Sequence, residues 1–296
     1  MALPDPVPHD RLFDSAWLKW GRAVVHAQTL QAHLNAIGTD EGDEPTLAVR
    51  ADYQPKRHGF AVIITDIDPM PPIWGLLLGD IANNLRSALD QIAWAVVTRG
   101  RTPPETLSEG RRRQIYFPIS KERDGFNAAL SSKLPGATRA DIARVRRYQP
   151  YHHPSRARWS ALLQLAEVNA GDKHRTIQPV WAIPITTDIE VIHQRDCVLT
   201  RGQTTGKRKT LQVDAELGFV RARKTGPEPH IEVTPHLTAE PAFNEYTLLR
   251  EWLKISVGWI QLLLYEFSEL PDDMAGIGVD PSQLRAIVSW KSPQWS

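Results

Sequence analysis

Apolar residues recur at helical spacing in four long stretches of the chain. A helix that buries one face carries apolar residues three or four positions apart, and Gly and Pro mark its ends. Gly38 and Gly100 follow the first two stretches, and prolines precede the second, where they suit a first helical turn. The long helices are therefore expected at about residues 10–37, 72–98, 156–175 and 244–269. Shorter helices are expected near residues 122–132 and 139–148.

Runs rich in Val, Ile, Thr and Tyr lie between these helices and predict β-strands. Strands are expected at residues 46–53 and 60–67, joined by the loop 54–59, which suits a hairpin. Further β-type runs, separated by Gly, Thr, Lys and Pro, occupy residues 187–236. Residues 114–119 look like a short extended segment with a proline near its end.

The order of these elements predicts an α+β fold. We expect an antiparallel helical bundle with inserted antiparallel β-hairpins or a small sheet, the insertions falling at residues 46–67 and 187–236. No linker divides the chain convincingly, so residues 1–296 are predicted to form a single domain. With 42% hydrophobic residues, the chain has enough apolar side chains for a sizeable core.

Composition favours a cytoplasmic protein with no membrane partner. No stretch approaches the ~18–20 apolar residues that span a bilayer. The first residues lack the basic and apolar parts of a signal peptide. The single cysteine, Cys197, excludes an intrachain disulfide and any multi-cysteine zinc site, which agrees with a reducing compartment.

Charge is distributed unevenly along the chain. The formal net charge is only +1, yet residues 101–225 hold 23 Lys and Arg against 12 Asp and Glu. A basic middle flanked by acidic ends is typical of a protein with an anionic partner, such as RNA or a nucleotide. A merely soluble surface explains the same split nearly as well.

One stripe of the predicted helix 72–98 is polar although most of that helix is apolar. This polar seam consists of Asp80, Asn83, Asn84, Arg86, Ser87, Asp90 and Gln91. Asn, Asp and Ser are poor interior helix residues, so a role other than helix formation is indicated. If the seam faces water, Arg86 and Asp90 form an i,i+4 ion pair. If it faces a cleft, Arg86 could bind a phosphate that Asn84 helps to orient.

A charged tetrad, Asp172-Lys173-His174-Arg175, follows Gly171, which is expected to end the third long helix. In a catalytic interpretation, His174 is an acid/base tuned by Asp172, and Lys173 and Arg175 hold a phosphate. In a structural interpretation, the cations of the tetrad meet the negative end of the helix dipole. Ligand binding without catalysis is the third alternative.

A second basic segment lies between the seam and the tetrad. Residues 139–158 carry six arginines and one acid, interleaved with tyrosines, a pattern suited to phosphate contact and base stacking. Arg147, Gln149 and Tyr151 are its candidate ligand-binding residues, although a solvated loop explains the segment slightly better than an RNA surface does. No metal or other cofactor is expected, because the chain has no His-Glu-x-x-His motif and no Gly-rich phosphate loop.

Four short motifs resemble, in this order, those of a widespread family of uncharacterised bacterial proteins. They are Asn84-Leu85-Arg86-Ser87-Ala88-Leu89-Asp90, Phe117-Pro118-Ile119, Gln149-Pro150-Tyr151 and the tetrad. The chain is also weakly similar to HEPN-type helical bundles, whose ribonuclease members place an Arg and a His four to six residues apart on one helix. Four residues separate Arg86 from Gln91, which stands where such a His would lie.

Two hypotheses of function follow. The first is a metal-independent endoribonuclease, or a related phosphodiester-acting enzyme, of a bacterial defence or toxin type, with His174, Arg86, Asp90 and Arg175 as catalytic residues. It predicts that the seam and the tetrad meet in one pocket. The second is a non-catalytic binding or sensor protein for a small anionic ligand or nucleic acid. A homodimer is considered in both cases, since bundles of this kind often associate through helix faces.

Overall fold

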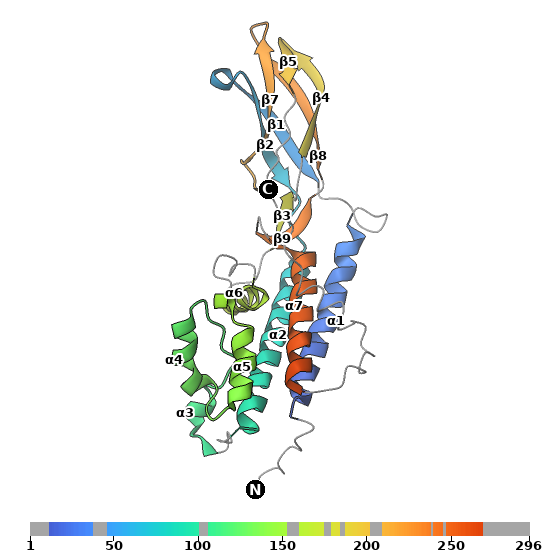
Figure 1. The fold of residues 1–296 in the computed structure, drawn as a ribbon. Coiled ribbons are helices and arrows are strands. Elements are labelled where there is room, and N and C mark those ends of the chain that lie inside the picture. Colours follow the sequence, from blue (N-terminus) through green and yellow to red (C-terminus); the bar gives the residue numbers. More distant parts are fainter. Residues whose placement is uncertain are drawn as a thin grey trace. The chain divides into compact units, whose positions relative to one another are not determined.

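The computed structural model describes nine stretches of the chain (Figure 1). They are residues 12–37, 46–100, 106–152, 160–174, 179–183, 187–201, 209–237, 239–244 and 247–268. The chain divides into two compact units, each assembled from separate parts of the sequence. The helical unit comprises Met1–Thr29, Leu76–Ile177 and Trp252–Ser296, and the strand unit comprises Leu30–Gly75 and Gln178–Glu251. Each unit is described by itself, and the single domain stays a prediction.

Helices account for the regular structure described in the helical unit (Figure 1). They are α1 (Asp14–Ala36), α2 (Pro72–Thr98), α3 (Glu109–Arg112), α4 (Arg123–Lys133), α5 (Arg139–Arg147), a 3₁₀ turn (Pro150–His152), α6 (Ala161–His174) and α7 (Leu249–Ser268). The first residues of α2 and α7 and the last of α1 belong to the strand unit. In the described part of the chain, no helix combines the length and apolar character that a membrane span requires.

Helices α1 and α7 run antiparallel and meet at two tryptophans. The indole N–H of Trp20 donates to the main-chain oxygen of Val257 at 3.0 Å, and the ring of Trp17 lies edge-on against Tyr265, 5.0 Å between centroids. Residue numbers rise along α1 as they fall along α7, which fixes the antiparallel direction. Trp20 is only 1% exposed, and burial of its large apolar surface contributes about 2–3 kcal/mol to folding.

The described residues of the strand unit form two four-stranded sheets and a two-stranded ladder, all antiparallel. Its strands are β1 (Leu47–Gln54), β2 (Gly59–Ile67), β3 (Val180–Ile183), β4 (Thr187–Arg195), β5 (Cys197–Arg201), β6 (Lys209–Thr210), β7 (Glu216–Lys224), β8 (His230–Leu237), β9 (Glu240–Asn244) and β10 (Thr247–Leu248). The sheet orders are β1-β2-β7-β5 and β10-β9-β3-β6, and β4 pairs with β8.

The first residue of β2 is a glycine that lies against β7. A Cβ on Gly59 would lie 2.2 Å from the main-chain oxygen of Val220, so only glycine allows β2 and β7 to approach this closely. Beside it, the guanidinium of Arg57 stacks over the ring of Phe219 and forms an ion pair with Glu216. The hairpin predicted at residues 46–67 is confirmed.

Most predicted elements are present, with corrections at their ends. The mixed α+β composition is confirmed, and α2 has the predicted bounds. The predicted helix 244–269 is wrong at its start, because the chain is a strand at Thr247–Leu248 and enters α7 only at Leu249. Gly171 does not end α6, which continues to His174. The antiparallel bundle with inserted hairpins stays a prediction.

Candidate functional site

The polar seam of α2 holds the main chain of a segment without regular secondary structure, residues 115–120. Arg86 and Asp90 form an ion pair of 2.7 Å, and both reach Phe117. Asp90 Oδ1 accepts the N–H of Phe117 at 3.0 Å, and Arg86 Nη2 donates to the carbonyl oxygen of Phe117 at 2.9 Å. Phe117 itself is buried. The pair therefore satisfies both main-chain groups of a buried residue, which would otherwise cost free energy.

Gln149 holds the same segment through its side-chain amide. Its side-chain Nε2 donates to the carbonyl oxygens of Pro118 at 2.9 Å and Val145 at 3.1 Å, and its Oε1 accepts the N–H of Ser120 at 3.0 Å. Two carbonyl acceptors require the NH₂ group, so the network fixes the orientation of the amide. Gln149 is 2% exposed. We call Arg86, Asp90 and Gln149 the clamp.

The clamp presents Tyr116 at the surface. Tyr116 is 37% exposed, although Phe117 beside it is buried. The ammonium nitrogen of Lys133 lies 3.6 Å from the ring centroid, and the guanidinium carbon of Arg86 lies 5.6 Å from it. Both cations are within the range of cation–π attraction. A fixed main chain thus displays an aromatic ring beside two positive charges.

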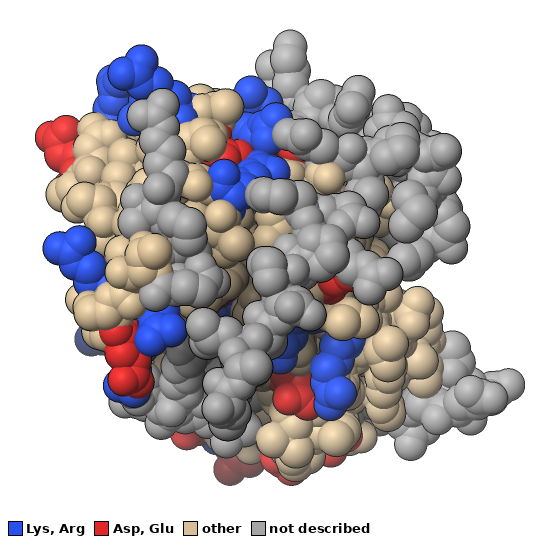
Figure 2. Space-filling view, turned by 90° about the horizontal axis from the view of Figure 1, so that it is seen from below, with Lys and Arg blue, Asp and Glu red and all other residues tan. Residues whose placement is uncertain are grey.

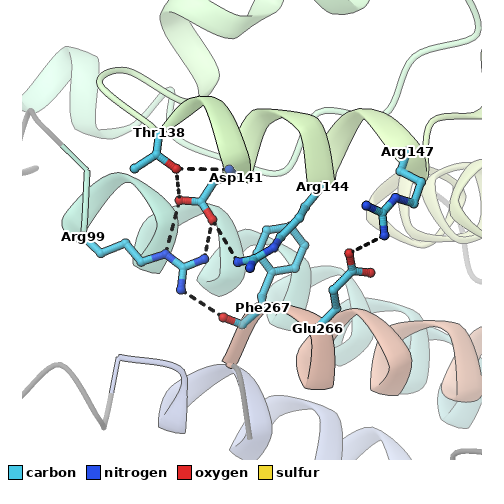
Figure 3. Close-up of polar contacts among 7 residues, drawn as sticks. All are labelled: Arg99, Thr138, Asp141, Arg144, Arg147, Glu266 and Phe267. Atoms are coloured by element: carbon cyan, nitrogen blue, oxygen red, sulfur yellow. Dashed lines mark hydrogen bonds and ion pairs between the residues drawn. The ribbon is translucent and has the colours of Figure 1, made fainter.

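A second network joins the start of α5 to the end of α2 (Figure 3). Asp141 is 2% exposed and accepts hydrogen bonds from Arg99 and from the hydroxyl of Thr138, which also caps the helix through the Asp141 N–H. Arg144 lies 3.5 Å from the same carboxylate. Arg99 also donates to the carbonyl oxygen of Phe267 at 3.0 Å, so the network reaches α7. These charges hold three helices together.

Arg147, a candidate ligand-binding residue, is held by a carboxylate of α7 (Figure 3). Its Nη1 donates to Glu266 Oε1 at 2.8 Å. The hydroxyl of Tyr148, which the figure does not draw, donates to the other oxygen of that carboxylate. Burial raises the pKa of Tyr148 above its usual range, and the hydrogen bond to Glu266 and its negative charge raise it further. The ring of Tyr148 packs edge-on against Trp259.

The remaining seam residues have different surroundings. Asn84 is 5% exposed and donates to the carbonyl oxygen of Asp80, one turn back on its own helix. Asp80 and Asn83 are exposed, whereas Ser87 and Gln91 are half-buried, and Gln91 accepts a hydrogen bond from Ser15 of α1. One part of the seam is thus a solvent-exposed face of α2, and another part contacts α1 and the segment 115–120.

Of the tetrad, the structure describes only the backbone of residues 172–174. Residues 172–174 form the end of α6, in the helical unit that also contains Arg86, and Arg175 lies outside the described residues. The side chains of Asp172, Lys173 and His174 lie outside them as well. A pocket shared by the seam and the tetrad stays a prediction.

Tyr151, the last of the candidate residues, lies in an aromatic group. Its ring is 5.8 Å from that of Phe126 and 4.6 Å from that of His152. Its hydroxyl oxygen is buried and has no hydrogen-bond partner among the residues described.

Charged side chains are mixed on the face that Figure 2 shows. Lys and Arg occur there in separate patches with Asp and Glu between them, rather than as one continuous basic stripe of described residues. Within the described ranges, no group of three or more His, Cys, Asp or Glu side chains is placed to hold a metal ion.

Sequence reasoning did not select several side chains of these networks as site residues, among them Tyr116, Lys133, Arg99, Asp141, Thr138 and Glu266. A signal was present for Asp141, because Thr138-x-x-Asp141 resembles a helix-capping box. None was present for Lys133, because its contact with Tyr116, 17 residues earlier, is a tertiary contact that no local sequence pattern marks. A scan against protein-family models and searches of curated proteins and of solved structures found no match to this chain.

Proposed function

We propose that this protein binds single-stranded RNA through its helical unit and does not cleave it. The observation that carries the proposal is Tyr116, a partly exposed ring on a clamped main chain with Lys133 3.6 Å from its centroid. An aromatic ring beside a cation suits a nucleobase with its phosphate, and each stacked base contributes about 1–3 kcal/mol whatever its identity.

The clamp favours binding over cleavage. Arg86 and Asp90, the catalytic candidates of the seam, are paired with each other and with the main chain of Phe117. A group that stabilises a phosphodiester transition state needs free donors aimed at the developing charge. Arg86 directs its Nε and Nη2 at Asp90 and Phe117 instead. The basic middle of the sequence supports an anionic partner without requiring a reaction.

Fluorescence anisotropy with labelled oligouridine, in EDTA, tests the proposal. We expect Tyr116→Ala to weaken binding about tenfold through the loss of one stacked base, and Tyr116→Phe to retain most of the affinity. Arg195→Gln is a matched control, because Arg195 is an exposed arginine of the strand unit paired only loosely with Glu228. Equal affinity for the Tyr116→Ala variant and the wild type would rule this site out.

The same samples distinguish binding from cleavage. The oligouridine is expected to remain intact on a sequencing gel with both wild type and His174→Ala. Fragments formed by the wild type and not by His174→Ala would replace this proposal with the nuclease hypothesis.

The antiparallel bundle and the homodimer belong to the same proposal. The contacts of Trp17 and Trp20 with α7 support the bundle. Leu18 and Val25, which are 75% and 59% exposed one above the other on α1, offer an apolar face for a second copy. Sedimentation of wild type and Leu18→Glu would test the dimer, which the substitution should dissociate.

A further inference from the structure

Three arginines in the second half of α5 differ in their partners. Arg144 lies 3.5 Å from Asp141, and Arg147 lies 2.8 Å from Glu266. Arg146 has no carboxylate partner among the described residues, and its Nη2 contacts only the amide oxygen of Asn127, at 3.4 Å. Its Nε is buried and lacks any described hydrogen-bond partner. A half-buried cation without a counter-ion is costly, so the missing negative charge points to a ligand.

A second unpaired polar group lies in the same region, which we call the Arg146 corner. The guanidinium carbon of Arg146 is 5.9 Å from the ring centroid of Phe126, and the ring of Tyr151 is 5.8 Å from that same ring. The hydroxyl oxygen of Tyr151 is buried and unpaired within the described structure, like Arg146 Nε. The guanidinium of Arg146 and the ring of Tyr151 therefore both lie near the ring of Phe126 in α4, and each side chain has a buried donor without a described partner.

His152 forms the exposed edge of the Arg146 corner. Its ring stacks 4.6 Å from Tyr151, and its Nε2 lies 2.9 Å from the carbonyl oxygen of Arg146. A carbonyl oxygen only accepts, so Nε2 carries the hydrogen. The histidine thereby ties the ring of Tyr151 to the main chain of α5.

We propose that Arg146 and Tyr151 bind a phosphate group through the Arg146 Nε–H and the Tyr151 O–H. The ligand must accept hydrogen bonds and carry negative charge, because both unpaired groups donate and one is a cation. A planar carboxylate would use the parallel Nε and Nη2 donors of the guanidinium, but Nη2 is directed at Asn127. Single donors from two separate side chains suit the spread oxygens of a phosphate better.

Titration calorimetry of the full chain with inorganic phosphate, in EDTA, tests this site. We expect binding that Tyr151→Phe weakens about fivefold, since that substitution removes only the hydroxyl and leaves the ring on Phe126. Arg146→Lys keeps a positive charge but removes the Nε–H, and we expect a comparable loss. Arg123→Gln, which removes an exposed charge from the same helix as Phe126, should leave phosphate affinity unchanged.

Oligouridine anisotropy with the same variants separates the two sources of phosphate. Binding of inorganic phosphate that both variants weaken supports a site for the free ion. No binding of inorganic phosphate, but weaker oligouridine binding by both variants and not by Arg123→Gln, supports a site for a phosphate of the RNA chain. The proposal is overturned if Tyr151→Phe and Arg146→Lys, shown to be folded by circular dichroism, bind both probes as the wild type does. The inorganic-phosphate result holds whether or not RNA binds at Tyr116.

Discussion

The clamp and the Arg146 corner both lie beside the C-terminal end of α5 but differ in how their polar groups are satisfied. In the clamp, Gln149 uses its amide for three hydrogen bonds, and Arg86 and Asp90 bond each other and Phe117. In the Arg146 corner, Arg146 Nε and the Tyr151 hydroxyl have no partner in the described ranges. Buried groups that are paired hold the fold, whereas buried donors left unpaired can bind a ligand. The short sequence motifs include residues of both regions. Only the hydrogen-bond partners seen in the structure therefore distinguish the clamp from the Arg146 corner.

The largest effect is expected where a buried charge would lose its partner. Asp141→Ala leaves Arg99, whose side chain is 18% exposed, without the carboxylate that it contacts. We expect a loss of about 3–5 kcal/mol in the free energy of unfolding, measured by urea denaturation. Glu109→Ala removes the partner of the exposed Arg113 and should cost less than about 1 kcal/mol. Similar losses for the two variants would contradict a structural role for the paired network.

A substitution in the clamp should lower the free energy of unfolding by a smaller amount and should also weaken RNA binding. Asp90→Ala removes the acceptor of the Phe117 N–H and the partner of Arg86, at a cost of about 2–3 kcal/mol. Because the clamp fixes the main chain that presents Tyr116, oligouridine affinity should also fall. Asp90→Asn retains an acceptor for Phe117 and should lose less of both. A variant that lost stability and kept full affinity would separate the clamp from the binding site.

The sequence predicted elements better than it predicted the clamp. The helix at Pro72–Thr98 was bounded correctly, because prolines can begin a helix and Gly100 can follow one. The short strands β9 and β10 were missed. β9 pairs with β3, about 60 positions earlier in the chain, and β10 is only two residues long and pairs with β9, so neither shows a local alternation. The i,i+4 pair of Arg86 and Asp90 could be read from their spacing. Their shared contact with the main chain of Phe117 could not, because every residue has these main-chain groups and no sequence pattern marks them.

Substitution of Tyr148 should have an intermediate effect on stability, and this effect should depend on pH. Tyr148→Phe removes the hydrogen bond to Glu266 and should cost about 1 kcal/mol at neutral pH. Since the pKa of Tyr148 is raised in the folded state, the folded chain keeps this proton when the unfolded chain has lost it. The stabilisation is full below about pH 10, the pKa of an unfolded tyrosine, and is lost as pH rises above it toward the folded value.

Thermal melts at rising pH check this linkage. The difference in melting temperature between wild type and Tyr148→Phe should be constant up to about pH 9 and shrink above about pH 10. Tyr53→Phe, which changes a half-buried tyrosine of β1 that packs on Phe60, provides the control for tyrosine titration in general. If the difference in melting temperature grew with pH, the pKa of Tyr148 would be lowered in the folded state and not raised.

The smallest effect on stability is expected at the surface that the clamp presents. Lys133 lies over the ring of Tyr116, and such a contact at a partly exposed site contributes about 0.5–1 kcal/mol. Lys133→Gln should therefore barely change the urea midpoint, whereas it removes one cation from the proposed RNA site and should weaken oligouridine binding with a shallower dependence on salt. Lys133→Arg keeps the charge over the ring and should restore both. Lys121→Gln removes an exposed lysine that pairs with Glu167 and is the matched control, with little change expected in either quantity. The contrary result is that Lys133→Gln lowers stability as far as Asp90→Ala does and leaves RNA affinity intact. Lys133 would then stabilise the fold, as the paired residues of the clamp do, and hydrogen-bond pairing would not separate structural from ligand-binding residues at Tyr116.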